Sequence, residues 1–383
     1  MNTVLHLERK FTSLTETFIV NQVNAISQFD VIVATISNLH NLTSHRTVIT
    51  PSQKSILSKS ARLLSLKTAR DLKNEIEGSG RIIDLIHTHY LVDAGFFRNF
   101  TKYYSVPKIC SAYGYDISSF PKRLFGFARL LLKPLFHEYD CFIAMSEDMK
   151  QDYIRLGCPE DKIVVHYYGT DTKKFYNAAR SYQIHDRPVK ILTVGTVEEK
   201  KAQHLVTDAL HVLVEKYKYS NFEYHIVGSG EYESIIKKKV EKYRLQDKVI
   251  FHGFIPHHDE RLMHLFSGAD IFILPSIRTS KSDKEGIPGT LIEAMANGLP
   301  VISTYHAGIP EVVEDGKDGF LTKERDVEGL ASALFKLVSD ASLRENLGRS
   351  AQLRATQQLD LHIRTKNLER IYQDILNGKK VFD

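Results

Sequence analysis

Residues 270–305 read DIFILPSIRTSKSDKEGIPGTLIEAMANGLPVISTY. The segment begins with an apolar run, passes through a polar loop and continues as a helical pattern that ends at Asn297 and Gly298, a pair that favours a helix C-terminus. A second apolar run follows at 300–305. Two short apolar runs joined by a helix are typical of parallel strands with a crossover helix. The stretch therefore predicts one strand–helix–strand unit of a parallel sheet.

The same alternation extends in both directions along the chain. The chain opens with TVLHLE, and further strands are expected at 29–37, 81–90, 106–114, 139–146, 189–195, 222–228 and 248–254. A polar segment with a proline near 183–188 separates the two series. We therefore predict an α/β protein with two Rossmann-like, doubly wound domains, 1–185 and 186–360, that face each other across a cleft. Residues 361–383 are expected to form a C-terminal helix that could cross back to the first domain.

Bulk composition narrows the class of protein. The 383 residues are 43% hydrophobic and 25% charged, as in a folded globular chain. The three cysteines are far apart, show no metal-ligand spacing and argue against a disulfide framework. The N-terminus lacks the pattern of a secretion signal, and no apolar run approaches 18 residues. We therefore expect a cytoplasmic protein that could also attach peripherally to the inner face of the cell membrane.

The net charge of +5 is unevenly distributed. Residues 1–187 carry 24 Lys and Arg against 18 Asp and Glu, whereas 188–383 carry 27 against 28. Two basic amphipathic stretches, 55–73 and 121–136, lie in the positive half. They suit the interface of an anionic membrane, and the alternative is a core-facing helix with a solvated basic face. Nucleic acid is not expected as a partner, because no binding module or aromatic-basic surface is recognised.

Two glutamates flank the start of the helix predicted within 270–305. Glu285 lies just before it, and Glu293 lies about one turn into it. Gly286 and Gly289 allow a ligand to approach the backbone closely, and the free N–H groups of the first turn can bind an anion. The carboxylates would then accept hydrogen bonds from the hydroxyls of a sugar and a ribose. The alternative is a pair of acids favoured by the helix dipole.

A second set of candidate residues follows the strand at 189–195. Gly195 begins a turn, and Lys200 and Lys201 lie near it, where an ammonium group can neutralise a diphosphate. Lysines on a solvated helix face are the alternative. The VGSG at 227–230 also follows a strand, but Glu233 stands where a dinucleotide fingerprint requires its last glycine, so an NAD site is poorly supported.

Together these segments resemble the retaining glycosyltransferases of family 4, which have the GT-B fold. The resemblance rests on ordered landmarks between residues 188 and 325: the basic glycine turn, VGSG, FHGFIP, ILPS, Glu285 and Glu293 as the E-x7-E motif, EAMANGLPVIST and GIPEVVEDGKDGFL. It implies that 186–360 binds a nucleotide sugar donor and that 1–185 binds a glycan or lipid-linked glycan acceptor. It also implies no cofactor and no metal, and no D-x-D motif occurs in the chain.

The resemblance implies a role for each matching residue. Glu285 would contact the donor sugar, Glu293 the ribose and Lys201 the diphosphate. The implied donor-binding set is Gly195, Thr196, Lys200, Gly286, Ile287, Gly289, Thr290 and Glu293. Two departures leave the donor open, because Thr196 stands where the family often has arginine and Pro288 stands where many members have glycine, which removes one amide donor.

His87 and His89 lie two residues apart on a predicted strand and therefore share a face. A similar H-x-H segment in the family places its second histidine beside the reacting sugar, which implies that His89 is catalytic together with Glu285 and Lys201. A metal-binding pair is one alternative, although no third ligand of suitable spacing is found nearby. A hydrogen-bonded structural histidine is another.

The first half also resembles one branch of the family. LTETFIVNQ (14–22) stands where many members have a glycine-rich loop and is similar to an element of the branch that builds exopolysaccharides such as colanic acid or amylovoran. Glu16, Asp116 and Tyr113 are candidates for the acceptor side, and for Glu16 and Asp116 a capping role is an equal alternative. Tyr113 departs from the histidine that relatives often have there.

The resulting prediction is a retaining, metal-independent hexosyltransferase. It would move a sugar from a UDP- or GDP-sugar to a growing, polyprenyl-diphosphate-linked glycan in exopolysaccharide, lipopolysaccharide or capsule synthesis. Two other classes remain open: a sugar-nucleotide epimerase of the same fold, and a non-catalytic nucleotide-sugar-binding protein.

Overall fold

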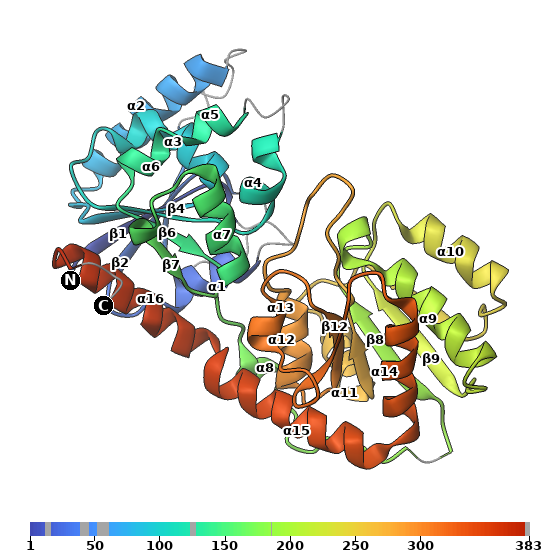
Figure 1. Ribbon diagram of the computed structural model, residues 1–383. Coiled ribbons are helices and arrows are strands. Elements are labelled where there is room, and N and C mark those ends of the chain that lie inside the picture. Colours follow the sequence, from blue (N-terminus) through green and yellow to red (C-terminus); the bar gives the residue numbers. More distant parts are fainter. Residues whose placement is uncertain (12–16, 39–45, 52–60, 123–127, 185, 380–383) are drawn as a thin grey trace. The chain divides into compact units, whose positions relative to one another are not determined.

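The computed structural model describes all residues except 12–16, 39–45, 52–60, 123–127, 185 and 380–383, and it describes 61–66 without their side chains. The chain forms two compact units (Figure 1). Unit 1 comprises Met1–Gly169 and Leu361–Asp383, and unit 2 comprises Thr170–Asp360. Each unit is built on one parallel sheet with helices packed against it.

Unit 1 contains a seven-stranded sheet in the order β3-β2-β1-β4-β5-β6-β7. Its strands are β1 (Thr3–Phe11), β2 (Asp30–Asn38), β3 (Thr47–Ile49), β4 (Leu85–His89), β5 (Lys108–Ser111), β6 (Cys141–Ala144) and β7 (Ile163–Val165). Every residue of β4 and β6 is buried, because helices cover both faces of a parallel sheet. The helices are α1 (Thr17–Ala25), α2 (Ala61–Gly78), α3 (Leu91–Thr101), α4 (Tyr115–Ser118), α5 (Ala128–Leu132), α6 (Leu135–Glu138), α7 (Glu147–Leu156) and α16 (Leu361–Leu376), with short 3₁₀ turns η2 (Phe120–Lys122) and η4 (Glu160–Lys162).

Unit 2 contains a six-stranded sheet in the order β10-β9-β8-β11-β12-β13. Its strands are β8 (Val189–Val194), β9 (Phe222–Val227), β10 (Val249–Gly253), β11 (Ile271–Ile273), β12 (Val301–Thr304) and β13 (Gly319–Thr322). The helices are α8 (Thr172–Phe175), α9 (Gln203–Glu215), α10 (Glu233–Lys242), α11 (Glu260–Gly268), α12 (Gly289–Ala296), α13 (Ile309–Val312), α14 (Val327–Ser339) and α15 (Ala341–Gln358), with the 3₁₀ turn η5 (Glu199–Lys201). Over the described part of the chain, no helix is both long enough and apolar enough to cross a bilayer.

The strand order of each unit indicates where a ligand can bind. In both units the chain starts at a central strand, adds strands on one side and then crosses to the other side. The reversal falls between β1 and β4 in unit 1 and between β8 and β11 in unit 2. Ligands of such sheets bind beyond the carboxyl ends of the strands at this reversal. A ligand site is therefore expected in the segments that follow these four strands.

The predicted fold class is confirmed, with two Rossmann-like parallel sheets and a strand at each expected position. Three further strands, β3, β7 and β13, were not predicted. All three are sheet edges of three or four residues. Such short runs carry no alternation of polar and apolar residues from which a strand could be recognised.

Packing contacts explain to which unit two segments belong: the segment before the expected domain boundary and the C-terminal helix. Residues 170–184 lie in unit 2, where Arg180 donates hydrogen bonds to the backbone carbonyls of Phe266, Ala269 and Asn297. The C-terminal helix α16 lies in unit 1 (Figure 1), and Leu368 and Tyr372 join its hydrophobic core.

Candidate functional site

The structure brings Glu285 together with Lys200 and Lys201. The lysines lie in the η5 turn after β8, and Glu285 lies in the 277–288 loop between β11 and α12. Lys201 Nζ forms a hydrogen-bonded ion pair with Glu285 Oε2, while Lys200 Nζ lies 3.7 Å from Glu285 Oε1 and 3.5 Å from Asp283 Oδ2. The side chains of Lys201 and Glu285 are only 13% and 10% exposed. The reversal point of unit 2 therefore holds a mostly buried cluster of two cations and two carboxylates.

The charges of this lysine–glutamate cluster stabilise one another. Burial by itself would raise the pKa of Glu285, but attraction to Lys201 and Lys200 outweighs burial and keeps this pKa below its usual value. Burial would likewise lower the pKa of Lys200, and attraction to Glu285 and Asp283 outweighs it and raises this pKa. The site therefore holds ionised groups that can exchange partners with a charged ligand.

The turn after β8 depends on two glycines. Gly195 has φ +155°, and a Cβ on Gly228 would lie 1.9 Å from the carbonyl oxygen of Gly195. Only glycine at 228 therefore lets the ends of β8 and β9 meet at this distance. Thr196, which stands where the family often has arginine, donates its hydroxyl hydrogen bond to Glu198 and so stays within the turn.

Helix α12 begins beside the same turn. Thr290 Oγ1 donates to the carbonyl oxygen of Val194 at 2.9 Å, which fixes the first turn of α12 against the end of β8. The residue before the helix is Pro288, and no side chain caps the helix there. Ile287 is buried and Gly286 is half-buried. The Leu291 N–H donates to the Pro288 carbonyl oxygen at 3.1 Å, and the binding of an anion by the first turn of α12 stays a prediction.

Glu293 has a partner that the sequence did not predict. Its Oε1 lies 2.9 Å from Nε2 of His257, which belongs to the loop between β10 and α11. Its second oxygen, Oε2, is buried and has no hydrogen-bond partner within the described structure.

Glu285 is also held by a histidine that the sequence did not reveal. Its backbone N–H donates to Nε2 of His306 at 3.1 Å, and Nδ1 of His306 lies 2.6 Å from Glu324 Oε1. Since Nε2 accepts, the ring proton sits on Nδ1 and is donated to Glu324. His257 and His306 both follow strands in polar loops, and no spacing rule connects them to the glutamates.

In unit 1, His87 and His89 share a face with a third histidine. His6 on β1 pairs in register with His87 on β4, and its Nδ1 lies 2.9 Å from Nε2 of His89. Nδ1 of His89 lies 2.6 Å from the Tyr113 hydroxyl. His87 contacts the hydroxyls of Ser111 and Tyr372 at 2.7 and 2.6 Å. This histidine cluster, His6, His87 and His89, is almost completely buried.

Burial keeps the histidine cluster neutral. It lowers the pKa of His89 to about 3, and it also lowers the pKa values of His6 and His87, with the neighbouring rings adding to the shift. No third ligand of suitable spacing was found in the sequence, but in the fold one ring nitrogen of each of the three histidines lies within 4.8 Å of the others. The sequence does not reveal this cluster, because β1 and β4 become neighbours only in the folded sheet. The catalytic role of His89 stays a prediction.

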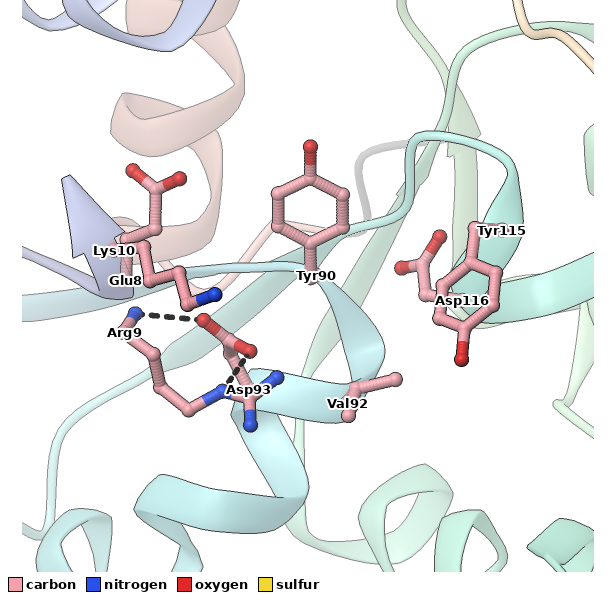
Figure 2. Close-up of a pocket in the computed structure, with 8 residues that line it drawn as sticks. All are labelled: Glu8, Arg9, Lys10, Tyr90, Val92, Asp93, Tyr115 and Asp116. Carbon is pink, nitrogen blue, oxygen red and sulfur yellow. Dashed lines mark hydrogen bonds and ion pairs between the residues drawn. The ribbon is translucent and has the colours of Figure 1, made fainter. Parts of the chain in front are cut away.

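The carboxyl ends of β1 and β4 border a small pocket (Figure 2). Its volume is about 170 Å³, and it is lined by Glu8, Arg9, Lys10, Tyr90, Val92, Asp93, Tyr115 and Asp116. Arg9 donates to Asp93 through both its backbone N–H and Nε, at 2.7 and 2.5 Å. Tyr90 has φ +68°, a strained value for a residue with a side chain, and joins β4 to α3. The pocket thus combines aromatic rings with charged groups at the reversal point of unit 1.

The acceptor-side candidates occupy different positions. Asp116 accepts hydrogen bonds from the backbone N–H groups of Leu91, Tyr113 and Gly114 at 2.8–3.2 Å, so it anchors this loop while lining the pocket. Burial raises its pKa to about 6, although these N–H groups oppose the shift. Tyr113 contacts His89. Glu16 lies outside the described residues.

The basic stretches are described only in part. Residues 55–60 and 123–127 lie outside the described residues, as do the side chains of 61–66. In the described part of the second stretch, α5 exposes Arg129, Leu130 and Leu131, the two leucines being 55% and 63% exposed, and Lys133 after the helix is exposed as well. This part of 121–136 presents apolar and basic side chains together on its surface.

Two family models and several known proteins are similar to the chain. Residues 15–174 match the family model "Glycosyltransferase Family 4", and residues 176–354 match "Glycosyl transferases group 1". The putative colanic acid biosynthesis glycosyltransferase WcaL of Salmonella typhimurium is 34% identical over 69% of this chain and 63% of its own length. The amylovoran biosynthesis glycosyltransferase AmsK of Erwinia amylovora is 34% identical over 62% of this chain and 57% of its own length. The chain thus spans less than two thirds of these relatives.

A solved structure shares the fold along the whole chain. The Anabaena protein Alr3699/HepE, in complex with UDP and glucose, superposes with a TM-score of 0.78 at 18% identity, over 97% of this chain and all of that one. The two family models follow each other almost without a gap and together span residues 15–354. The chain therefore belongs to glycosyltransferase family 4 and has the GT-B fold.

Proposed function

We propose that the chain transfers a sugar from a nucleoside diphosphate sugar to a growing glycan in exopolysaccharide synthesis. The observation that carries this proposal is the lysine–glutamate cluster beside the uncapped start of α12. Without a ligand, Lys201 is neutralised by Glu285. A diphosphate would offer the lysine a second anionic partner and free the Glu285 carboxylate to accept hydrogen bonds from sugar hydroxyls.

The proposed reaction exchanges one bond for another at the anomeric carbon of the donor. The bond from this carbon to the diphosphate oxygen breaks, the acceptor hydroxyl oxygen forms the new glycosidic bond, and the hydroxyl proton is taken up by the departing diphosphate or by solvent. Negative charge then develops on the departing diphosphate. Lys201 and the first-turn amides of α12 would stabilise that charge from fixed positions. Retention of anomeric configuration and independence from metal belong to the proposal and come from the family resemblance.

The relatives indicate which substrates to test first. WcaL and AmsK are named for the synthesis of colanic acid and amylovoran, which supports a glycan acceptor and a role in surface polysaccharide synthesis. The Anabaena protein was solved with UDP and glucose, so UDP-glucose is a suitable first donor. A polyprenyl-diphosphate-linked acceptor and a cytoplasmic location complete the proposal. The location is supported by Cys110, Cys141 and Cys158, which are all buried free thiols.

The test is a donor screen that measures nucleotide release, with UDP-sugars and GDP-sugars offered separately. We expect Glu285→Ala and Lys201→Ala each to lower transfer about 100-fold or more, because each removes a preorganised charged contact to the reacting donor. Lys216→Ala is a matched control, since Lys216 forms an exposed ion pair with Glu328 in the same unit. EDTA is expected to leave the rate unchanged.

Three results would contradict the proposal, each in a different way. Full turnover by both Glu285→Ala and Lys201→Ala would show that the lysine–glutamate cluster is not the active site. A change of the donor sugar in the absence of acceptor, seen by NMR of the product, would indicate an epimerase. Calorimetry without affinity for any nucleoside diphosphate would indicate a protein that does not use nucleotide sugars.

The pocket of unit 1 is proposed to bind the acceptor. Its volume of about 170 Å³ is of the order of one sugar ring, and its aromatic and carboxylate groups can stack on and hydrogen-bond to a sugar. We expect Tyr115→Ala to raise KM for the acceptor while hydrolysis of the donor stays constant. An unchanged KM would place the acceptor elsewhere.

Attachment to an anionic membrane is a further part of the proposal. It is supported by the positive excess of residues 1–187 and by the exposed Arg129, Leu130, Leu131 and Lys133. Exposed leucines beside basic groups are typical of a helix that lies in a membrane interface.

A further inference from the structure

A chain of two hydrogen bonds holds the backbone of Glu285. The Glu285 N–H donates to Nε2 of His306 at 3.1 Å, and Nδ1 of His306 lies 2.6 Å from Oε1 of Glu324. The His306 side chain is 1% exposed and that of Glu324 is 26% exposed. A buried imidazole whose two nitrogens are both engaged has one fixed orientation, so it forms a rigid support for the loop that it contacts.

The neighbours of His306 and Glu324 decide where the protons lie. A backbone N–H can only donate, so Nε2 of His306 must present its lone pair, and the proton of the neutral ring is on Nδ1. The second oxygen of Glu324, Oε2, accepts from the Arg278 N–H at 3.0 Å and from the Arg325 guanidinium at 3.3 Å. All three of these partners of Glu324 are donors, so both of its oxygens must be acceptors.

These contacts join the carboxyl ends of three neighbouring strands of unit 2. His306 follows β12, Glu324 follows β13, and the loop that carries Glu285 follows β11. A further hydrogen bond, from the Arg325 guanidinium to the carbonyl oxygen of Arg278 at 2.6 Å, binds the start of the same loop to the segment after β13. The strand order of the sheet therefore sets the position of Glu285.

Glu285 is thus held at both its backbone and its side chain. The carboxylate forms the mostly buried ion pair with Lys201, and the backbone N–H is held by His306. In the proposed function the lysine turns to the diphosphate and releases the carboxylate. From that moment the backbone contact with His306 is the part of this arrangement that still fixes Glu285.

We propose that His306 and Glu324 are positioning residues, which keep Glu285 at the reacting donor after Lys201 has turned to the diphosphate. The inference rests on the proposed function and extends it to two residues that act only through the backbone of Glu285. They should therefore affect the rate of the chemical step and leave the binding of the nucleotide intact, because a small displacement of a reacting group lowers the rate without removing the binding site.

The first experiment needs no ligand. Amide hydrogen exchange of peptides that cover 278–286, measured by mass spectrometry on the full chain, should be about 10-fold faster in His306→Phe, because the Glu285 N–H loses its acceptor. His306→Gln should keep the wild-type rate, since its amide oxygen can accept from Glu285 while its NH₂ group donates to Glu324. Glu324→Gln has the same shape as the wild type, but its NH₂ group must face one of three donors, so exchange should also become faster.

The second experiment separates kcat from nucleotide affinity. Nucleotide release is measured with the donor found in the screen, starting with UDP-glucose, and the Kd of UDP or GDP is measured by calorimetry. His306→Phe and Glu324→Gln should each lower kcat about 10- to 100-fold and change Kd by less than about threefold. His306→Gln should restore kcat to within about threefold of the wild type. Glu328→Gln, which alters an exposed glutamate paired with Lys216, is the control and should leave kcat unchanged.

A double variant shows whether His306 acts through Glu285. Residues that act as a unit have non-additive effects, so His306→Phe should not slow Glu285→Ala any further. A further loss in the double variant, or a loss of nucleotide affinity in parallel with kcat, would overturn the inference, because His306 would then support the fold and not the position of Glu285.

The outcomes also distinguish this inference from the proposed function. Full turnover by Glu285→Ala, or a wild-type chain that binds neither UDP nor GDP, would overturn the proposed function and the inference with it. If Glu285→Ala is inactive while His306→Phe and Glu324→Gln keep the wild-type kcat, the inference alone is overturned.

Discussion

Mild acid should destabilise unit 1 through its buried histidines. Burial lowers the pKa of both His89 and His166 to about 3 in the folded chain, whereas an unfolded histidine has a pKa of about 6.5. As the pH falls below 6.5, these histidines therefore become protonated in the unfolded state but stay neutral in the folded state. Stability that is present above pH 6.5 is lost as the pH falls toward 3.

The size of the effect follows from the two pKa values. At pH 5 an unfolded histidine is about 1.5 pH units below its pKa, which corresponds to about 2 kcal/mol for each buried imidazole. His89 and His166 together would remove about 4 kcal/mol, and the lowered pKa values of His6 and His87 act in the same direction. A loss of this size is a large fraction of the roughly 5–15 kcal/mol that stabilises an ordinary domain.

Amide hydrogen exchange measured by mass spectrometry can follow this loss, with each rate corrected for the intrinsic exchange rate at that pH. Peptides that cover β4 should show a falling free energy of opening between pH 7.5 and pH 5. His166→Phe should reduce the loss by about 2 kcal/mol, because one buried imidazole no longer titrates and its Nε2 has no hydrogen-bond partner to lose within the described residues. His137→Gln, which removes an exposed histidine from the same unit, is the control. An opening energy of β4 that does not change with pH, or a His166→Phe slope equal to that of the wild type, would refute the reasoning.

Three other predictions test the packing and the surface. Gly228→Ala should destabilise unit 2 by about 3 kcal/mol or more, because the new Cβ would lie 1.9 Å from the Gly195 carbonyl oxygen; unaltered urea unfolding would show that this turn can relax. Arg180→Ala should cost about 3 kcal/mol, since three backbone carbonyls lose their donor, and a melting temperature equal to that of the wild type would contradict it. Sedimentation with anionic vesicles should fall with added salt and with Arg129→Glu, each basic residue contributing about 1 kcal/mol; binding that ignores both changes would rule out an electrostatic docking surface.

Local patterns in the sequence were sufficient for most strands of the fold, but not for the short edge strands β3, β7 and β13. The apolar runs at 271–274 and 301–304, with the helix between them, are confirmed as β11, β12 and α12 with its neighbouring residues. Their signals are local, because the alternation of strand and helix and the glycine at a helix end act within a few residues. Two of the residues proposed to bind the donor were also found from local patterns: Lys201 by the turn after a strand and Glu285 by the start of a helix, and the structure joins them in an ion pair.

Contacts between residues far apart in the sequence could not be predicted from such local patterns. His6 lies 83 residues from His89, and their contact exists because β1 and β4 are neighbours at the centre of the sheet. Tyr372 reaches His87 from the last helix of the chain for the same reason of packing. A rule based on ligand spacing examines nearby residues and therefore missed both.

By itself the sequence determined two Rossmann-like sheets and the family, and it indicated the residues that we propose bind the donor, because periodicity, turn residues and ordered landmarks are properties of short segments. Only the tertiary structure decided what each of those residues touches. It placed His306 against the backbone of Glu285 and His257 against the carboxylate of Glu293, and it turned His89 into a member of a buried cluster. The physical reason is that hydrogen-bond partners of buried charges are chosen by strand order and helix packing, which bring together loops that no local rule connects.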